Sequence, residues 1–203
     1  MAEMLDLTMP IDERTPVFPG DPEQEIEQIA EVEKDGWTEK RLTFNSHFST
    51  HIDAPIHMKP GGKTLDDFDI DYFIGEAVVI DASDQKKIEP SLEAVQEDDI
   101  IFFYTGHMDK AYEEDFFEDN PVITEETAEK LIDKEVRIVG LDSYTPDNDP
   151  FPVHKKLFAE DILIVENLVN LEELVGERFQ CYILPLKIRD ADGAPCRVLA
   201  VQD

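Results

Sequence analysis

Five short runs of apolar residues occur between residues 77 and 188, and each is rich in Val, Ile or aromatic side chains. Runs of this length and composition are typical of buried β-strands. The predicted strands cover residues 77–81, 99–106, 136–142, 162–168 and 179–188, and a short strand is expected over 4–8.

Two further segments show helical spacing. Thr124 is a favourable N-cap residue, two glutamates follow in the first turn, and apolar residues then recur at helical spacing, which predicts a helix over about 124–134. A second, short helix is expected over 171–175, ending at Gly176, which suits the left-handed position after a helix. Strands outnumber helices, so the expected fold class is mixed α/β with a strand-rich core.

Turn and loop signals complete the predicted organisation. Four prolines and Gly20 lie between residues 10 and 22, which excludes a helix and favours a stiff loop able to form the wall of a pocket. Asp192-Gly193 predicts the turn of a hairpin between strands at 182–188 and 196–201. Since neither an internal repeat nor a low-complexity linker is visible, we interpret residues 1–203 as a single domain.

The charge of the chain narrows the classes of partner. The 48 acidic and 18 basic residues give a formal charge of −30, which disfavours nucleic acid and anionic membrane surfaces as partners. The 41% of hydrophobic residues suffices for a core. We expect a globular protein whose partner is a small molecule or another protein. The acidity fits either a salt-rich cytoplasm or an ordinary acidic surface.

The cysteines and the N-terminal residues indicate in which cellular compartment the protein is expected. Cys181 and Cys196 have no CxxC or CxxH context, so two buried small side chains are favoured over a disulfide or a ligand role. Residues 1–10 lack a basic stretch followed by an apolar one, and a run of about 18 apolar residues is missing. We therefore expect a soluble, cytoplasmic protein without a membrane partner.

Three of the five histidines, His47, His51 and His57, fall within eleven residues, and Asp53 lies between them. A straight strand would spread the four side chains over roughly 33 Å, so the segment has to bend if they share one site. Imidazole nitrogen and carboxylate oxygen suit zinc or manganese, and Asp53 can bridge two ions. The alternatives are a solvated polar loop and a metal-scavenging tract, and such a tract would lack the interleaved Asp53 and the Ala54-Pro55 turn.

Two residues outside this cluster become candidate ligands beside it. Glu166 lies in a predicted buried strand, where a carboxylate is costly unless a cation or hydrogen-bond donors compensate it. It could also face water at a strand end. His154, twelve residues earlier, would by itself be interpreted as a surface histidine. The fifth histidine, His107, follows a strand end and either lines the pocket or is an ordinary loop residue.

The stretch HFSTHIDAPIH, residues 47–57, resembles the HxGTHxDxPxH signature of the cyclase family of metal-dependent hydrolases, whose best-known members are the bacterial kynurenine formamidases. The likeness extends over nearly the whole chain. Its further matching segments are residues 15–21, 73–78, 104–106, 140–143, 151–154, 164–168, 184–186 and 192–197.

The resemblance implies a metal centre with two zinc ions per chain, or manganese in their place. It implies that His47 and His51 bind one ion, that Asp53 bridges to the second, that His154 binds the second, and that Glu166 bridges both. It assigns His57 as the proton donor and acceptor. The fold that it implies is a swivelling β/β/α barrel-like domain, commonly a homodimer.

Two positions depart from the family pattern. Ser49 replaces the usual Gly of the first motif, which changes the turn without removing a ligand. Phe18 stands where kynurenine formamidases typically carry a substrate-stacking Trp. Phe18 is therefore the expected substrate-binding aromatic residue, and its replacement of Trp leaves a different substrate open.

The leading hypothesis is a metal-dependent amidohydrolase of the arylformamidase type, acting in tryptophan catabolism. It would cleave N-formyl-L-kynurenine to formate and L-kynurenine with a hydroxide activated by two metal ions. The alternatives are hydrolysis of a cyclic amide, imide, lactone or ester on the same site, and a non-catalytic metal- or ligand-binding module. A Ser or Cys nucleophile is disfavoured, since the sequence contains no GxSxG and neither cysteine adjoins a histidine.

Overall fold

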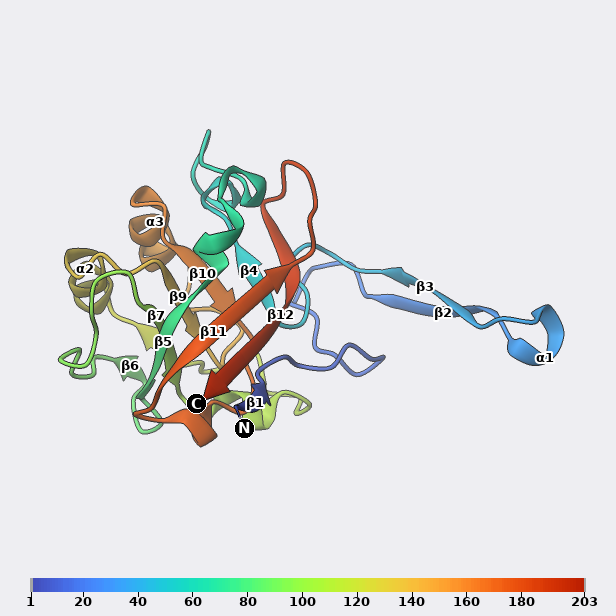
Figure 1. The fold of residues 1–203 in the computed structure, drawn as a ribbon, viewed down its shortest axis with the longest axis horizontal. Coiled ribbons are helices and arrows are strands. Elements are labelled where there is room, and N and C mark those ends of the chain that lie inside the picture. The colour runs from blue at the N-terminus through green and yellow to red at the C-terminus, as the bar shows by residue number, and fades with distance from the viewer. Residues whose placement is uncertain (1, 203) are drawn as a thin grey trace.

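Strand β12 (Gly193–Gln202) closes the main sheet into a barrel, because it pairs with β11 along one edge and with β4 along the other (Figure 1). The computed structural model describes residues 2–202. Around the barrel the strands follow the order β12, β11, β5, β7, β9, β10, β4, and β1 extends the edge of β12. Their bounds are β1 Glu3–Asp6, β4 His51–Asp53, β5 Ile74–Asp81, β7 Ile100–Tyr104, β9 Ile138–Leu141, β10 Leu163–Glu166 and β11 Arg178–Pro185.

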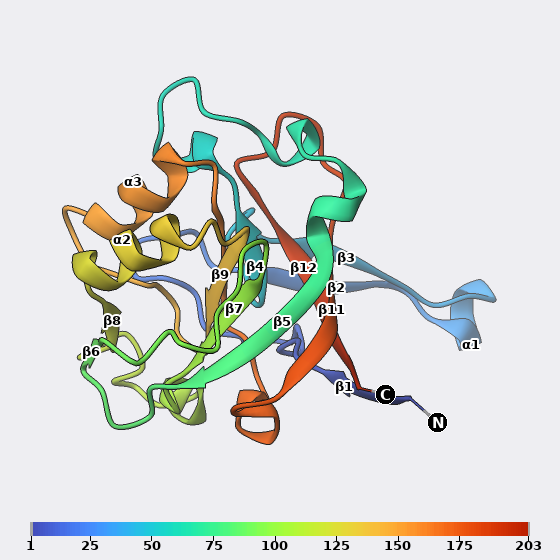
Figure 2. The ribbon, with the colours of Figure 1, turned by 60° about the vertical axis from the view of Figure 1, so that its left-hand side comes forward.

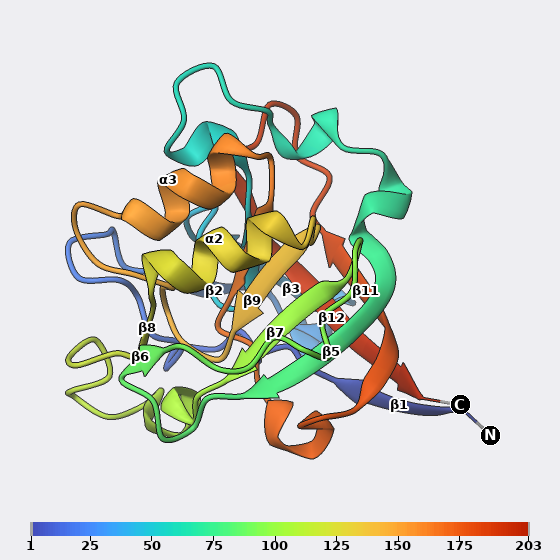
Figure 3. The ribbon, with the colours of Figure 1, turned by 90° about the vertical axis from the view of Figure 1, so that its left-hand side faces the viewer.

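Four neighbouring strands, β5, β7, β9 and β10, run parallel, so crossovers have to connect them. Helix α2 (Glu125–Asp133) lies between β7 and β9 in the chain, and α3 (Pro152–Ala159) lies between β9 and β10. Both helices pack on the outside of these strands (Figure 3). Side chains therefore alternate along β7: Ile101 and Phe103 pack toward the helices, whereas Phe102 belongs to the core of the barrel.

The predicted strand-rich single domain is confirmed, and each predicted strand overlaps an observed one. The helix expected over 124–134 is α2, and its cap forms as predicted, because the Thr127 N–H donates to Thr124 Oγ1 at 3.2 Å. The segment 171–175 forms a 3₁₀ helix over Leu171–Leu174, and Gly176 adopts a left-handed φ of +79°.

The predicted hairpin turn at Asp192-Gly193 is wrong in its detail. Strands β11 and β12 do form a hairpin, but residues 186–192 make a longer connection, and Gly193 is already the first residue of β12. Gly193 pairs with Asp53 of β4. The local Asp-Gly turn preference is overridden here by pairing with a strand that lies far away in the sequence.

The pattern of apolar residues did not predict a two-stranded ribbon that projects from the barrel (Figures 1 and 2). It consists of β2 (Glu25–Ala30) and β3 (Glu39–Thr43), with the single-turn helix α1 (Val32–Asp35) at its tip. We call residues 25–43 the arm. Every residue of β3 is exposed, so the arm lacks the apolar alternation by which buried strands are found.

The remaining elements are short. Strands β6 (Lys87–Ile88) and β8 (Val122–Ile123) form a small parallel pair. Single 3₁₀ turns cover Pro55–His57, Leu65–Asp67, Ile70–Phe73 and His107–Lys110. Cys181 and Cys196 are buried and free, as expected, and burial raises the pKa of both thiols. Within residues 2–202, every helix is too short or too polar to cross a membrane.

Candidate metal centre

The three-residue strand β4 carries His51 and Asp53 into the barrel wall, where both side chains are buried. Two partners hold it in place: β10 sets Glu166 opposite His51, and β12 sets Gly193 opposite Asp53. Residues that face each other in an antiparallel pair have side chains on the same side of the sheet. The register therefore brings the Glu166 carboxylate to His51 and leaves space beside Asp53.

The expected bend in the His47–His57 segment is present. After β4 the chain turns at Pro55 into a 3₁₀ turn that ends at His57. The ring centroids of His47 and His57 consequently lie only 4.0 Å apart, and those of His47 and His51 lie 5.2 Å apart. All three histidines border one cavity.

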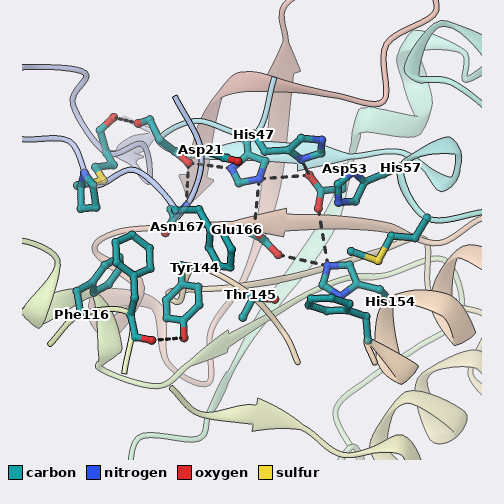
Figure 4. A pocket seen from close by; sticks show the side chains of 18 residues that line it. Asp21, His47, Asp53, His57, Phe116, Tyr144, Thr145, His154, Glu166 and Asn167 are labelled. Atoms are coloured by element: carbon teal, nitrogen blue, oxygen red, sulfur yellow. Dashed lines mark hydrogen bonds and ion pairs between the residues drawn. The ribbon is translucent and has the colours of Figure 1, made fainter. Parts of the chain in front are cut away.

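His154 is not a surface residue. It lies on α3, only 2% of its surface is exposed, and its Nε2 atom is 3.5 Å from Glu166 Oε1 and 3.9 Å from Asp53 Oδ2. Figure 4 shows His154 pointing toward Asp53, with Glu166 next to both. The structure thus brings His154 and Glu166 to the cluster that holds Asp53.

The five candidate ligands form two groups that share Asp53, one of His47, His51 and Asp53 and the other of Asp53, His154 and Glu166. A third group, outside this pair, consists of His47, His57 and Asp192, and in each of the three the potential ligand atoms lie within 4.8 Å of one another. His51 Nε2 is buried without a hydrogen bond, 3.3 Å from both Asp53 Oδ1 and Glu166 Oε2. An unpartnered buried nitrogen facing two carboxylates is what a cation between them would satisfy. The residues fit a two-metal site.

The close approach of carboxylates and imidazoles shifts the pKa values of several of these side chains. Burial opposes ionisation of Asp53, yet the charges of His47 and His51 and the hydrogen bond with His47 hold its pKa well below 3.8. Burial also lowers the pKa of His154, but the carboxylates of Asp147 and Glu166 outweigh this and raise it to about 9. Burial lowers the pKa of His57 from 6.5.

Two aspartates that contact the candidate ligands were not predicted. Asp147 Oδ1 lies 2.5 Å from His154 Nδ1, and Asp192 Oδ2 lies 2.9 Å from His47 Nε2. Carboxylates of this kind fix the ring orientation of metal-binding histidines. Asp192 belongs to the segment 192–197 that carries part of the family likeness, whereas the sequence around Asp147 gives no signal of this contact.

The cavity has a volume of about 330 Å³, and aromatic rings form much of its outer wall. Phe18 is 48% exposed, and its ring centroid lies 5.9 Å from that of Phe117 and 6.0 Å from that of Tyr144. His107 does not line the cavity. Its ring stacks against Phe116, and its Nε2 atom lies 2.8 Å from the Phe116 carbonyl oxygen, so it supports the aromatic wall from behind.

The family model described as "Putative cyclase" matches residues 5–148. The chain belongs to the cyclase family. This cyclase is 32% identical over 205 residues to the kynurenine formamidase of Bacillus cereus, covering 98% of this chain and 97% of that one. It is 33% identical over 200 residues to an uncharacterized protein of Methanocaldococcus jannaschii, covering 98% and 99% of the two chains.

Solved structures agree with the family. A potential metal-dependent hydrolase with cyclase activity matches at 29% identity and a TM-score of 0.84, over 100% of this cyclase and 99% of that chain. An isatin hydrolase bound to the product analogue thioisatinate matches at 25% identity and a TM-score of 0.89, over 99% and 92% of the two chains. The family, the fold and the ligand groups agree that this cyclase is an enzyme of the metal-dependent hydrolase type.

Ser49, the departure in the first motif, keeps the turn of a glycine. Its φ of 59° lies in the left-handed region, which Gly enters at no steric cost. Ser49 is buried, and its Oγ donates a hydrogen bond to the Met9 carbonyl oxygen at 3.0 Å. This bond offsets part of the conformational cost of the left-handed turn that leads into β4.

Proposed function

We propose that the single domain spanning residues 1–203 cleaves the amide C–N bond of N-formyl-L-kynurenine, releasing formate and L-kynurenine, as one step of tryptophan breakdown. The observation that carries the proposal is the pair of ligand groups sharing Asp53, which opens into a cavity with an aromatic outer wall. Bacillus relatives that bear the name kynurenine formamidase are about 32% identical over nearly the full chain, which supports this substrate.

In this proposal five side chains would hold two metal ions. His47 and His51 would hold the first, His154 would hold the second, and Asp53 and Glu166 would serve both. Three imidazoles and two carboxylates suit zinc, and manganese is the alternative. Two bound ions would supply Lewis acidity at the substrate carbonyl and lower the pKa of an attacking water.

His57 is the proton donor and acceptor in this scheme. It borders the cavity beside His47, and burial keeps its pKa below 6.5, so its imidazole is mostly neutral at pH 7 and ready to accept a proton. Passing that proton to the departing aryl amine makes the amine a neutral leaving group. Phe18, together with Phe117 and Tyr144, would hold the aryl ring.

A cyclic amide is the second candidate substrate. The cavity of about 330 Å³ suits a compact bicyclic ring, and an isatin hydrolase shares the fold over nearly the whole chain. The same groups would open a lactam, with the ring nitrogen accepting the proton from His57. Phe18 in place of Trp fits either substrate, since both present an aromatic face.

We further propose a homodimer in the cytoplasm. The arm exposes Ile29, Val32, Trp37 and Leu42, and an isolated two-stranded ribbon is marginally stable in water. Packing against a second copy would cover these side chains. The two free buried cysteines fit a reducing compartment. Light scattering of the wild type and of the doubly substituted variant Val32→Ser/Trp37→Ser tests the dimer, and a monomeric wild type would reject it.

The activity is tested with purified protein loaded with zinc or with manganese, whose metal content is measured by elemental analysis. Formate and aryl amine release from N-formyl-L-kynurenine are followed beside ring opening of isatin, with a chelator-treated sample as the control. Chelator-sensitive release of formate supports the first substrate. Ring opening without formate release selects the second, and no turnover of either by protein holding two ions rejects both.

A further inference from the structure

The cavity is lined by 18 of the described residues, and neither Lys nor Arg is among them. Its carboxylates are Asp53 and Glu166 at the candidate metal centre and Asp21 elsewhere in the wall. A carboxylate on the part of a substrate remote from the scissile bond would therefore meet neither Lys nor Arg among the described residues that line the cavity. The formal charge of −30 adds to its repulsion.

Asp21 and Phe18 are presented by one turn, in which the Asp21 N–H donates to the Phe18 carbonyl oxygen at 3.0 Å. Both residues line the cavity. Asp21 is exposed, and within residues 2–202 no basic side chain forms an ion pair with it. An aryl ring held against Phe18 thus lies next to a carboxylate that is available to a positively charged substituent.

From this juxtaposition we propose that the site selects its substrate by charge: Asp21 binds an ammonium group on the side chain of an aryl amide, and amides whose side chain carries only a carboxylate are rejected. The inference rests on the proposed amidohydrolase function and deepens it. N-formyl-L-kynurenine carries an ammonium and a carboxylate on one carbon, so it binds through the ammonium group while its carboxylate points out of the cavity. A neutral cyclic amide gains nothing from Asp21.

A set of formamides with the same scissile bond tests the charge selection on the metal-loaded full-length protein. N-formyl-L-kynurenine carries both charges, N-formylkynuramine keeps only the ammonium, 4-(2-formamidophenyl)-4-oxobutanoate keeps only the carboxylate, and formanilide carries neither. We expect kcat/KM to be highest for N-formylkynuramine and at least about tenfold lower for the carboxylate-only compound.

Variants of Asp21 separate its role from that of the general charge. Asp21→Asn is expected to lower kcat/KM about tenfold for the two ammonium substrates, mainly through KM, and to leave formanilide unchanged. Asp21→Lys is expected to favour the carboxylate-only compound. Glu23→Lys is the matched control, because Glu23 is exposed, lies outside the cavity and changes the net charge equally. It is expected to behave like the wild type.

The outcomes are distinguishable. Turnover of formanilide with equal kcat/KM across the series, or an equal effect of Asp21→Lys and Glu23→Lys, overturns the charge selection and leaves the hydrolase function intact. If no formamide is cleaved by protein holding two ions, the proposed function fails. In that case the charge selection is still tested by calorimetry with two compounds that lack the formyl group: kynuramine, which carries only the ammonium, and 4-(2-aminophenyl)-4-oxobutanoate, which carries only the carboxylate. Equal affinity for the two overturns the role of Asp21.

Discussion

Asp147 Oδ1 lies 2.5 Å from His154 Nδ1, and this contact turns the other ring nitrogen, Nε2, toward Glu166 and Asp53. The same carboxylate accepts a hydrogen bond from the Val153 N–H at 2.6 Å, so it ties the first turn of α3 to the loop before it. Asp147 therefore fixes both the position of the helix and the orientation of the ring that it carries into the site.

Substitution of Asp147 is expected to weaken one of the two metal sites. Asp147→Asn keeps an oxygen acceptor but loses the charge that orients His154, and we expect the affinity for one ion to fall about 10- to 100-fold while the other is retained. Competition with a chromophoric chelator measures this. Asp133→Asn, an exposed change on α2, is the control. Unchanged affinity for both ions in Asp147→Asn would contradict the positioning role.

Substitution of Gly193 is predicted to destabilise the protein for a steric reason. A Cβ atom at this position would lie 2.6 Å from His47 Cε1, closer than real contacts allow, and 3.1 Å from the Ile52 carbonyl oxygen, which is a tight contact. We expect Gly193→Ala to lower the free energy of unfolding by about 1–3 kcal/mol and to displace the His47 ring. Urea unfolding of the metal-free protein measures the change.

A double-mutant cycle tests whether the clash with His47 causes the loss of stability in Gly193→Ala. In a His47→Ala background the added methyl group has room, so Gly193→Ala should cost clearly less than in the wild type. An equal cost in both backgrounds would mean that the clash with the Ile52 backbone decides the effect and that the His47 ring moves aside freely.

The sequence allowed the strands, helix α2 and the cluster of His47, His51 and Asp53 to be predicted, because each is a local pattern. His154 and Glu166 were candidates from the sequence, but only the family resemblance assigned them to the same site as Asp53, since only the folded barrel brings α3 and β10 to β4. The contact of Asp147 with His154 is local, but it depends on how the loop before α3 folds, and the place of Gly193 depends on long-range register; a pattern of apolar residues encodes neither. The arm was missed because nearly all of its strand residues are exposed, so neither strand shows a run of buried apolar residues.

His57 is expected to be required for turnover and dispensable for metal binding. His57→Ala removes the group proposed to transfer the proton, and we expect kcat to fall by at least about 100-fold. Elemental analysis should still find two ions per chain, because both ligand groups that share Asp53 are complete without His57. Loss of an ion together with activity would show that His57 is a ligand instead.

Burial of Asp142 predicts a pH dependence of stability. The residue is 3% exposed, and burial raises its pKa to about 7, although hydrogen bonds from Thr105 and Gly106 oppose the rise. The ordinary value is 3.8, so between these two pH values the unfolded chain loses the proton while the folded protein keeps it. The stabilising contribution of the protonated group is complete below pH 3.8 and is lost as the pH rises to 7.

The comparison with Asp142→Asn isolates this contribution, because the amide does not titrate. We expect the free energy of unfolding of the wild type, minus that of the variant, to fall by about 1.4 kcal/mol per pH unit between pH 5 and pH 7 and to level off above pH 8. Urea unfolding at constant salt concentration measures both proteins. A difference that stays flat over this range would mean that Asp142 is ionised throughout, held by the three donors that follow the end of β7.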